Sequence, residues 1–285
     1  MRISLLVPYR PNKTTPNRAR TWKWLQKYWK HELPDAEVIV GHSCSTIFSK
    51  SEAINDAARR ATGDVFVIID SDAYLSGETI RWCADTIRES RRVGHPVWFM
   101  PYRALYRLTE QATEKVLTSN PKKPYRFPDS VDPIDVESTV GTEVGHYFGA
   151  MIQIMPREAF EAVGCWDPRY AGWGAEDISF LMAVDTLWGK HKSVDASVFH
   201  LWHPVFKTAH PHARLWEGQD RSTHSKLAER YRRANGDYDK MRVLVDEGCD
   251  CSQECMCEPQ GPLKPAIMWG TVLLGLLYWV VSWFL

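Results

Sequence analysis

The sequence predicts an α/β fold in which an open sheet is flanked by helices and followed by further helices and one apolar C-terminal helix. Short apolar runs alternate with amphipathic segments over the first hundred residues, a strand and helix pattern resumes later, and the last nineteen residues carry no charge. A chain of 285 residues is long enough to bury a large core. Basic and acidic residues both number 35, so no overall positive charge indicates a nucleic-acid partner.

The N-terminal part alternates strands with helices. Buried strands are predicted at 3–7, 37–40, 65–69 and 97–100, and amphipathic helices at 17–33, 49–62 and 76–93. Ser49 and Glu52 form a capping-box pair at the start of the second helix, and Gly63 ends it. Continuous apolar strands separated by helices are typical of a parallel sheet covered on both faces.

The second half begins after a long polar segment. Residues 119–146 are rich in Pro, Asp and Ser and are expected to form a loop. Beyond it we expect a strand at 151–155, a short helix closed by Gly164, a helix from about Glu176 to Trp188, a strand at 193–199 and polar helices within 220–247.

The N-terminal and C-terminal segments predict where in the cell the protein is located. The apolar run before Pro8 is too short for the core of a signal peptide, so a cytoplasmic body is expected. Residues 267–285 would span roughly 28 Å as a helix, about the thickness of a bilayer core. We therefore expect a single-pass tail anchor; a buried core helix is the alternative.

The cysteines fall into two groups. Cys44, Cys83 and Cys165 are scattered and are interpreted as small apolar residues of a cytosolic protein. The other four are packed into CDCSQECMC, namely Cys249, Cys251, Cys255 and Cys257. A zinc knot, disulfides and acylation of this linker all stay open.

Polar side chains follow the first and third predicted strands, at the edge where open sheets bind ligands. Asp70 and Asp72 follow the run VFVII, and two carboxylates one residue apart suit Mg²⁺ or Mn²⁺ bridging a diphosphate. Ordinary turn residues are the alternative. Candidate contacts to a nucleotide are Pro8, Tyr9, Arg10, Lys50, Asn55, Asp70, Ser71 and Asp72.

The stretch VFHLWHP places two histidines at the end of a late strand. It lacks the helix and the intervening Glu of a zinc-protease motif. We expect one neutral imidazole to complete the coordination of an Asp72-bound cation. His200 is preferred because it comes first after the strand, with His203 and Asp70 as weaker candidates. A surface histidine is the alternative.

The stretch AGWGAED, residues 171–177, precedes an apolar helix. Gly172 and Gly174 allow a tight turn and close approach of the backbone to a sugar, and Trp173 can stack on a sugar ring. Asp177 at a helix N-terminus is favoured as a carboxylate and can act as a general base. A helix cap is the structural alternative, and the two are compatible.

Three stretches in this order resemble the GT-A glycosyltransferases. KSEAINDAARRATGDVFVIIDSDAYL resembles the nucleotide-sugar half of the metal-dependent enzymes. GAMIQIMPREAFEAVGCWDPRYAGWGAEDISF resembles the acceptor half of family 2 and of the galactosyltransferase C-terminal region, although Cys165 stands where that pattern has Gly. VFHLWHP matches the late metal-binding histidine of that group.

The resemblance implies a nucleotide-diphospho-sugar transferase fold with an open mixed sheet. It makes Asp72 and His200 metal ligands, Asp70 a nucleotide-side residue, Asp177 the base, Glu176 an acceptor-positioning partner, and Gly172, Trp173 and Gly174 acceptor contacts. The implied domains are 1–215 (1–105 for the donor, 147–205 for the acceptor), a helical extension at 216–248, a Cys-rich linker at 249–266 and the anchor at 267–285.

The implied function is a metal-dependent, inverting transfer from a nucleotide sugar to an acceptor on a glycan, a lipid-linked molecule or a protein. We expect a UDP-sugar as the donor and Mn²⁺ or Mg²⁺ as the metal. A bacterial or phage origin is expected. The alternative is an inactive GT-A-like sugar-binding or scaffold protein at the membrane.

Overall fold

The computed structural model describes residues 2–11, 16–94, 96–127, 131–141, 151–172, 174–204 and 226–248. The chain divides into two units, Met1–Cys255 and Met256–Leu285, and all described residues belong to the first. Within that unit the expected mixed α/β architecture is confirmed.

Six strands form the first sheet in the order β2-β1-β3-β8-β5-β9. Their bounds are β1 Ile3–Pro8, β2 Glu37–Gly41, β3 Val65–Ile69, β5 Phe99–Met100, β8 Ile152–Pro156 and β9 Lys192–Ser193. β1 pairs in parallel with β2 and β3, as the alternating pattern predicts. β8 then lies antiparallel between β3 and β5, so the sheet is mixed.

Four strands form a second sheet in the order β4-β10-β6-β7. These are β4 Ala73–Tyr74, β6 Ala104–Leu108, β7 Val136–Gly141 and β10 Ser197–His200. β7 and the short helix η1 (Pro133–Asp135) correct the expectation of a continuous loop at 119–146. The segment forms a strand because it pairs antiparallel with β6, a long-range contact that its own composition does not reveal.

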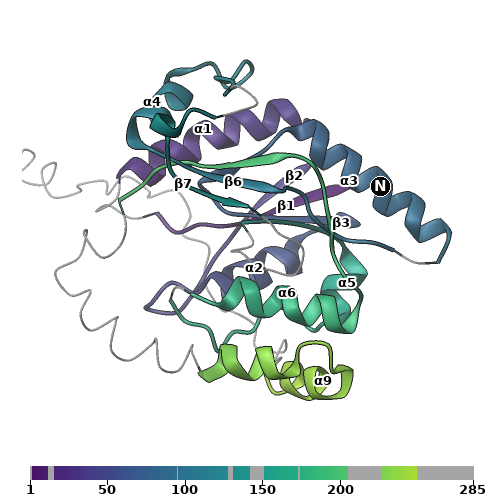
Figure 1. Ribbon diagram of the computed structural model, residues 1–285. Coiled ribbons are helices and arrows are strands. Elements are labelled where there is room, and N and C mark those ends of the chain that lie inside the picture. The colour runs from purple at the N-terminus through teal and green to yellow at the C-terminus, as the bar shows by residue number, and fades with distance from the viewer. Residues whose placement is uncertain are drawn as a thin grey trace, which may run out of the picture. The chain divides into compact units, whose positions relative to one another are not determined.

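Helices cover both faces of the first sheet (Figure 1). Their bounds are α1 Pro16–Glu32, α2 Lys50–Arg60, α3 Gly77–Arg92, α4 Glu110–Thr118, α5 Arg157–Ala162, α6 Glu176–Leu187 and α9 Tyr238–Asp246, and residues 226–234 are also helical. α1 and α3 lie on one face, and α2, α5 and α6 on the other (Figure 1). Residues 226–234 and α9 pack on α6 through a separate apolar cluster that includes Met182, Tyr231 and Met241.

The predicted capping box at α2 is half formed. The Ser49 hydroxyl accepts a hydrogen bond from the Glu52 N–H at 3.2 Å. The Glu52 carboxylate instead accepts from the hydroxyl of Ser43 at 2.8 Å. It therefore holds the loop before α2 and not the backbone at the cap.

The expected C-terminal anchor is corrected by the structure. None of the helices within the described ranges has both the length and the apolar character that a membrane crossing requires. The longest of them, α1, has 17 residues and carries charged side chains along its length. Residues 267–285 and the Cys249–Cys257 cluster lie outside the described residues. The single-pass anchor, and the localisation inferred from it, therefore find no support.

The interpretation of the scattered cysteines was right for one residue and wrong for another. Cys83 is a buried free thiol, and Cys165 is a half-buried one. Cys44 is exposed and disulfide-bonded, so it is not a small apolar core residue.

Candidate active site

Backbone pairing brings Asp72 and His200 together. β3 ends at Ile69, and residues 70–72 turn the chain into β4. β10 pairs antiparallel with β4, which places His200 opposite Ala73. The Leu201 N–H continues this pairing by donating to the Asp72 carbonyl at 2.7 Å. The strand register therefore fixes an imidazole beside a carboxylate 128 residues earlier in the chain.

Asp72, His200 and His203 form a cluster of three ligand groups whose donor atoms all lie within 4.8 Å of one another. His200 Nε2 lies 3.5 Å from Asp72 Oδ1, and His203 Nε2 lies 3.4 Å from Asp72 Oδ2. Two ligands that are each about 2.1 Å from one ion are separated by about 3.0 Å at a right angle and about 3.4 Å at a tetrahedral angle. The two distances from Asp72 to the imidazoles fit ligands that share one divalent cation.

The protonation states also fit a cation. Burial opposes ionisation of Asp72, but His200, Arg18 and His203 lower its pKa to about 2. Burial lowers the pKa of His200 to about 4, so its imidazole is neutral at pH 7. His203 Nδ1 lies 3.1 Å from the Pro204 carbonyl, which can only accept. A hydrogen on Nδ1 satisfies this contact, and Nε2 is the ring nitrogen that faces Asp72.

Arg18 is a site residue that the sequence analysis missed. Its Nη2 lies 3.1 Å from Asp72 Oδ2. The residue lies near the start of α1, far from the aspartates in sequence, and the helical pattern of α1 gives no indication of its partner. It adds positive charge beside the cluster.

Lys50 connects the aspartate turn to the carboxylates of α6. Its Nζ lies 2.6 Å from Asp70 Oδ1, with 13% of the Lys50 side chain and 21% of the Asp70 side chain exposed. Burial lowers the pKa of Lys50, but Asp70, Asp177 and Glu176 raise it above its usual value. Burial raises the pKa of Asp70 to about 6, and Lys50 opposes that rise. One largely buried cation therefore interacts with three carboxylates.

The turn before α6 has the backbone conformation that its glycines predict. Gly172, Gly174 and Ala175 have φ angles of 98°, 119° and 71°. A Cβ built on Gly174 meets no atom within 4 Å, so the space above it is open. Trp173, the predicted wall for an acceptor sugar, lies outside the described residues.

The two carboxylates of this turn differ in environment. Glu176 is buried, and its Oε2 accepts from the Gly174 N–H at 2.8 Å. Burial, and to a lesser extent the negative charge of Asp177, raise the pKa of Glu176 to about 7. The positive charge of Lys50 opposes this rise. Asp177 is half-buried, and its Oδ1 accepts from the Ile178 N–H at 2.8 Å. Asp177 is thus the more solvent-accessible carboxylate of the pair.

The other predicted nucleotide contacts are tied to protein groups. Arg10 donates to the carbonyls of Ser43 at 2.5 Å and Ser45 at 2.6 Å, so it organises the loop after β2. The Asn55 amide donates to the Trp166 carbonyl at 2.7 Å and accepts from its N–H at 3.0 Å. Pro8 ends β1, the Tyr9 ring packs at a tilt against Trp22, and Ser71 is buried in the aspartate turn.

Tyr102 is a second site residue that the sequence did not reveal. It is fully buried after β5. Burial raises its pKa, and the charges of Asp177 and Asp70 add to the rise. The segment that carries it has no periodic pattern that marks a functional position.

Comparisons with known proteins found similarity in structure only. No protein-family model and no curated protein matches the chain. The catalytic domain of Drosophila beta1,4-galactosyltransferase 7 in complex with xylobiose matches at 15% identity and a TM-score of 0.39, covering 80% of this chain and 79% of that chain. TarS 1-349 of S. aureus in complex with UDP matches at 15% identity and a TM-score of 0.45, covering 87% and 70%. GalNAc-T7 with UDP, GalNAc and Mn²⁺ matches at 14% identity and a TM-score of 0.42, covering 86% and 54%. These structural neighbours are glycosyltransferases.

Proposed function

We propose that the chain is a metal-dependent, inverting glycosyltransferase that moves a sugar from a nucleotide donor, a UDP-sugar first among them, to an acceptor hydroxyl. One observation carries this proposal. A three-ligand Asp–His–His cluster and an accessible carboxylate at a helix N-terminus are linked by the buried Lys50, which pairs with Asp70 and interacts with Asp177. The proposed donor site and the proposed base would therefore lie close in space, although they are far apart in sequence.

The donor side is assigned to the aspartate turn. Asp72, His200 and His203 would hold a divalent cation, with Asp70 toward the nucleotide. Such a cation would supply positive charge to stabilise a departing diphosphate. Because two of the three groups are imidazoles, whereas Mg²⁺ favours oxygen ligands, Mn²⁺ is the cation to test first. Arg18 would add a guanidinium for phosphate oxygens.

The acceptor side is assigned to the turn at 172–177. The acceptor hydroxyl attacks the anomeric carbon from the face opposite the diphosphate, forming a C–O bond as the bond to the diphosphate breaks. The hydroxyl proton goes to Asp177, and the electron pair of the broken bond leaves with the nucleotide. Glu176 holds the turn through the Gly174 N–H, and Gly172, Trp173 and Gly174 are proposed to contact the acceptor.

The test is nucleotide release by the full chain from a panel of nucleotide sugars, with Mn²⁺ or with EDTA. We expect metal-dependent release from one donor. Asp72→Ala should lose metal-dependent UDP binding. Asp177→Asn should keep UDP binding and lose about 10²–10⁴-fold in transfer. Asp85→Asn, at an exposed position on α3, is the control. Folded protein that neither binds UDP nor releases nucleotide from any donor would overturn the proposal.

A further inference from the structure

A network of charged and polar contacts joins the loop before α6 to the C-terminal helices. We call residues 166–172 the acceptor loop, and residues 226–234 with α9 the C-terminal helices. Asp167 and Arg169 form a paired contact within the acceptor loop: Arg169 Nε lies 2.9 Å from Asp167 Oδ1, and Nη2 lies 2.6 Å from Oδ2. Only 4% of the Asp167 side chain is exposed.

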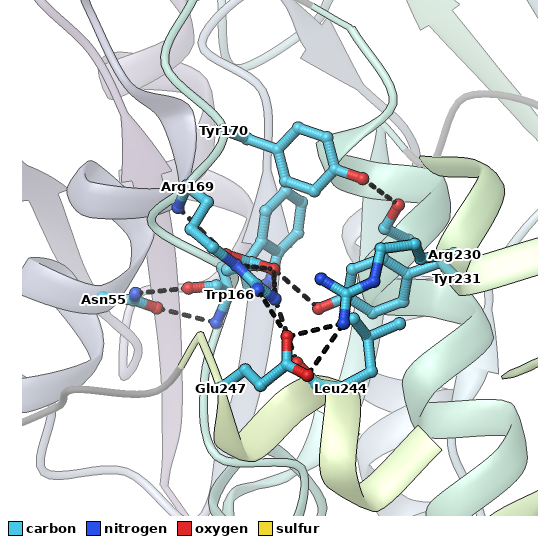
Figure 2. A network of polar contacts seen from close by, with 10 residues as sticks. Asn55, Trp166, Arg169, Tyr170, Arg230, Tyr231, Leu244 and Glu247 are labelled. Carbon is cyan, nitrogen blue, oxygen red and sulfur yellow. Dashed lines mark hydrogen bonds and ion pairs between the residues drawn. The ribbon is translucent and has the colours of Figure 1, made fainter. Parts of the chain in front are cut away.

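Both C-terminal helices bind this pair, as Figure 2 shows for the labelled partners of Arg169. The Tyr231 hydroxyl donates to Asp167 Oδ2 at 2.9 Å. Arg169 Nη2 donates to the Leu244 carbonyl at 2.9 Å, and Nη1 donates to Glu247 Oε2 at 3.2 Å. Gly248 packs closely against the Asp167–Arg169 pair, because a Cβ there would lie 2.9 Å from both Arg169 Nη2 and Asp167 Oδ1.

Other contacts fix the rest of the acceptor loop. Asn55 of α2 holds both backbone groups of Trp166 (Figure 2). The Ser49 hydroxyl donates to the Tyr170 carbonyl at 2.8 Å. The hydroxyls of Tyr170 and Ser179 lie 2.6 Å apart, which ties the loop to the first turns of α6. The segment that leads into Glu176 is thus held from α2, from α6 and from the C-terminal helices.

We propose that the C-terminal helices position the acceptor carboxylates, and that Arg169 and Tyr231 are positioning residues for the transfer step. This rests on the proposed function. Burying a carboxylate as deeply as Asp167 costs free energy unless hydrogen bonds or ion pairs satisfy both of its oxygens. Removing one of these contacts is therefore expected to destabilise the loop. Asp177 lies five residues after the end of the acceptor loop. A shift of the loop would therefore move the proposed base relative to the donor. Misplacement of a reacting group by about 1 Å can cost about 10²-fold in rate.

The proposal predicts separate effects on the donor and acceptor sides. Tyr231→Phe and Gly248→Ala should each lower acceptor-dependent transfer about tenfold or more, through acceptor KM and kcat together. Mn²⁺-dependent UDP binding should change by less than about twofold, because Asp72 and His200 lie on other elements. Tyr238→Phe is the matched control, since Tyr238 lies on α9 with 57% of its surface exposed.

The experiment measures UDP affinity, donor hydrolysis without acceptor, and transfer with acceptor, on the full chain. Hydrogen exchange of peptides that cover 166–182 is measured on the same samples. Faster exchange in Tyr231→Phe, with transfer lowered and UDP binding kept, supports the proposal. A parallel loss of UDP binding and transfer overturns it, because that is the result of a general loss of structure. Unchanged exchange and unchanged transfer also overturn it.

The hydrogen-exchange measurement tests this inference separately from the proposed function. If the unmodified protein transfers no sugar from any donor, the proposed function fails. Exchange in Tyr231→Phe against Tyr238→Phe then still shows whether the C-terminal helices order the acceptor loop. Equal exchange in the two variants would remove the positioning role in either case.

Discussion

Replacing Lys50 by methionine removes a buried cation from among three carboxylates. Lys50 Nζ lies 2.6 Å from Asp70, and Asp177 and Glu176 also act on it. Methionine keeps most of the side-chain volume, so the loss is mainly electrostatic. Removing one partner of a buried ion pair costs about 3–5 kcal/mol. Because 21% of the Asp70 side chain is still exposed, we expect the lower end, about 3 kcal/mol of unfolding free energy.

Urea unfolding monitored by tryptophan fluorescence measures this loss, and Lys240→Met is the matched control. Lys240 Nζ also lies 2.6 Å from a carboxylate, that of Asp237, but 71% of the Lys240 side chain is exposed. An exposed pair of this kind contributes little, so the control should leave the unfolding free energy nearly unchanged.

A double-mutant cycle then assigns the loss to the ion pair. Lys50→Met combined with Asp70→Asn should cost less than the sum of the two single variants by about 1 kcal/mol or more, because residues in direct contact couple. If the two substitutions are additive, or if Lys50→Met costs no more than Lys240→Met, the reasoning about this buried cation is refuted.

Three further predictions follow from the site. The pKa of Glu176 is raised from 4.5 to about 7, so the folded state holds the extra proton in that range. Its contribution to the unfolding free energy is therefore full below pH 4.5 and falls as the pH rises to about 7, and Glu176→Gln should flatten this part of the pH profile. Electron paramagnetic resonance should show bound Mn²⁺ in the unmodified protein and in Asp85→Asn but not in Asp72→Ala; equal binding in all three would exclude the cluster as the cation site. Cys165 has a φ of 128°, where side chains are strained, so Cys165→Gly should be about 1 kcal/mol more stable than Cys165→Ala in thermal unfolding, and the reverse order would show that no strain is stored there.

Local patterns were sufficient for the elements that surround the aspartates. The apolar run 65–69 and the Ser49 cap predicted β3 and the start of α2 with the bounds that the structure shows. The aspartate turn and the carboxylates of α6 could be located for the same reason, because each directly follows or begins a regular element. Their roles in binding and catalysis stay predictions.

Features that depend on pairing between distant segments could not be predicted. β6 and β7 form because they pair with each other, and β6 also pairs with β10 in the second sheet. Arg18 and Tyr102 belong to the site only through tertiary placement, since neither lies in a recognisable motif. Cys165 shows a partial exception: the resemblance marks its position as a usual glycine, and its positive φ gives the physical reason.

The antiparallel position of β8 has a consequence for how the protein acquires its activity during synthesis. Until Ile152–Pro156 has been made, β3 lacks its neighbour on that side and presents an apolar, unpaired edge. The same pairing anchors the aspartate turn, because the Asp70 N–H donates to the Met151 carbonyl at 3.0 Å. The sheet therefore interleaves the two halves of the chain, and a nascent chain that stops after its first hundred residues would carry the aspartates without a completed strand order. Such an intermediate is prone to aggregation, and the ribosome must deliver about half of the polypeptide before the aspartate turn is held in place.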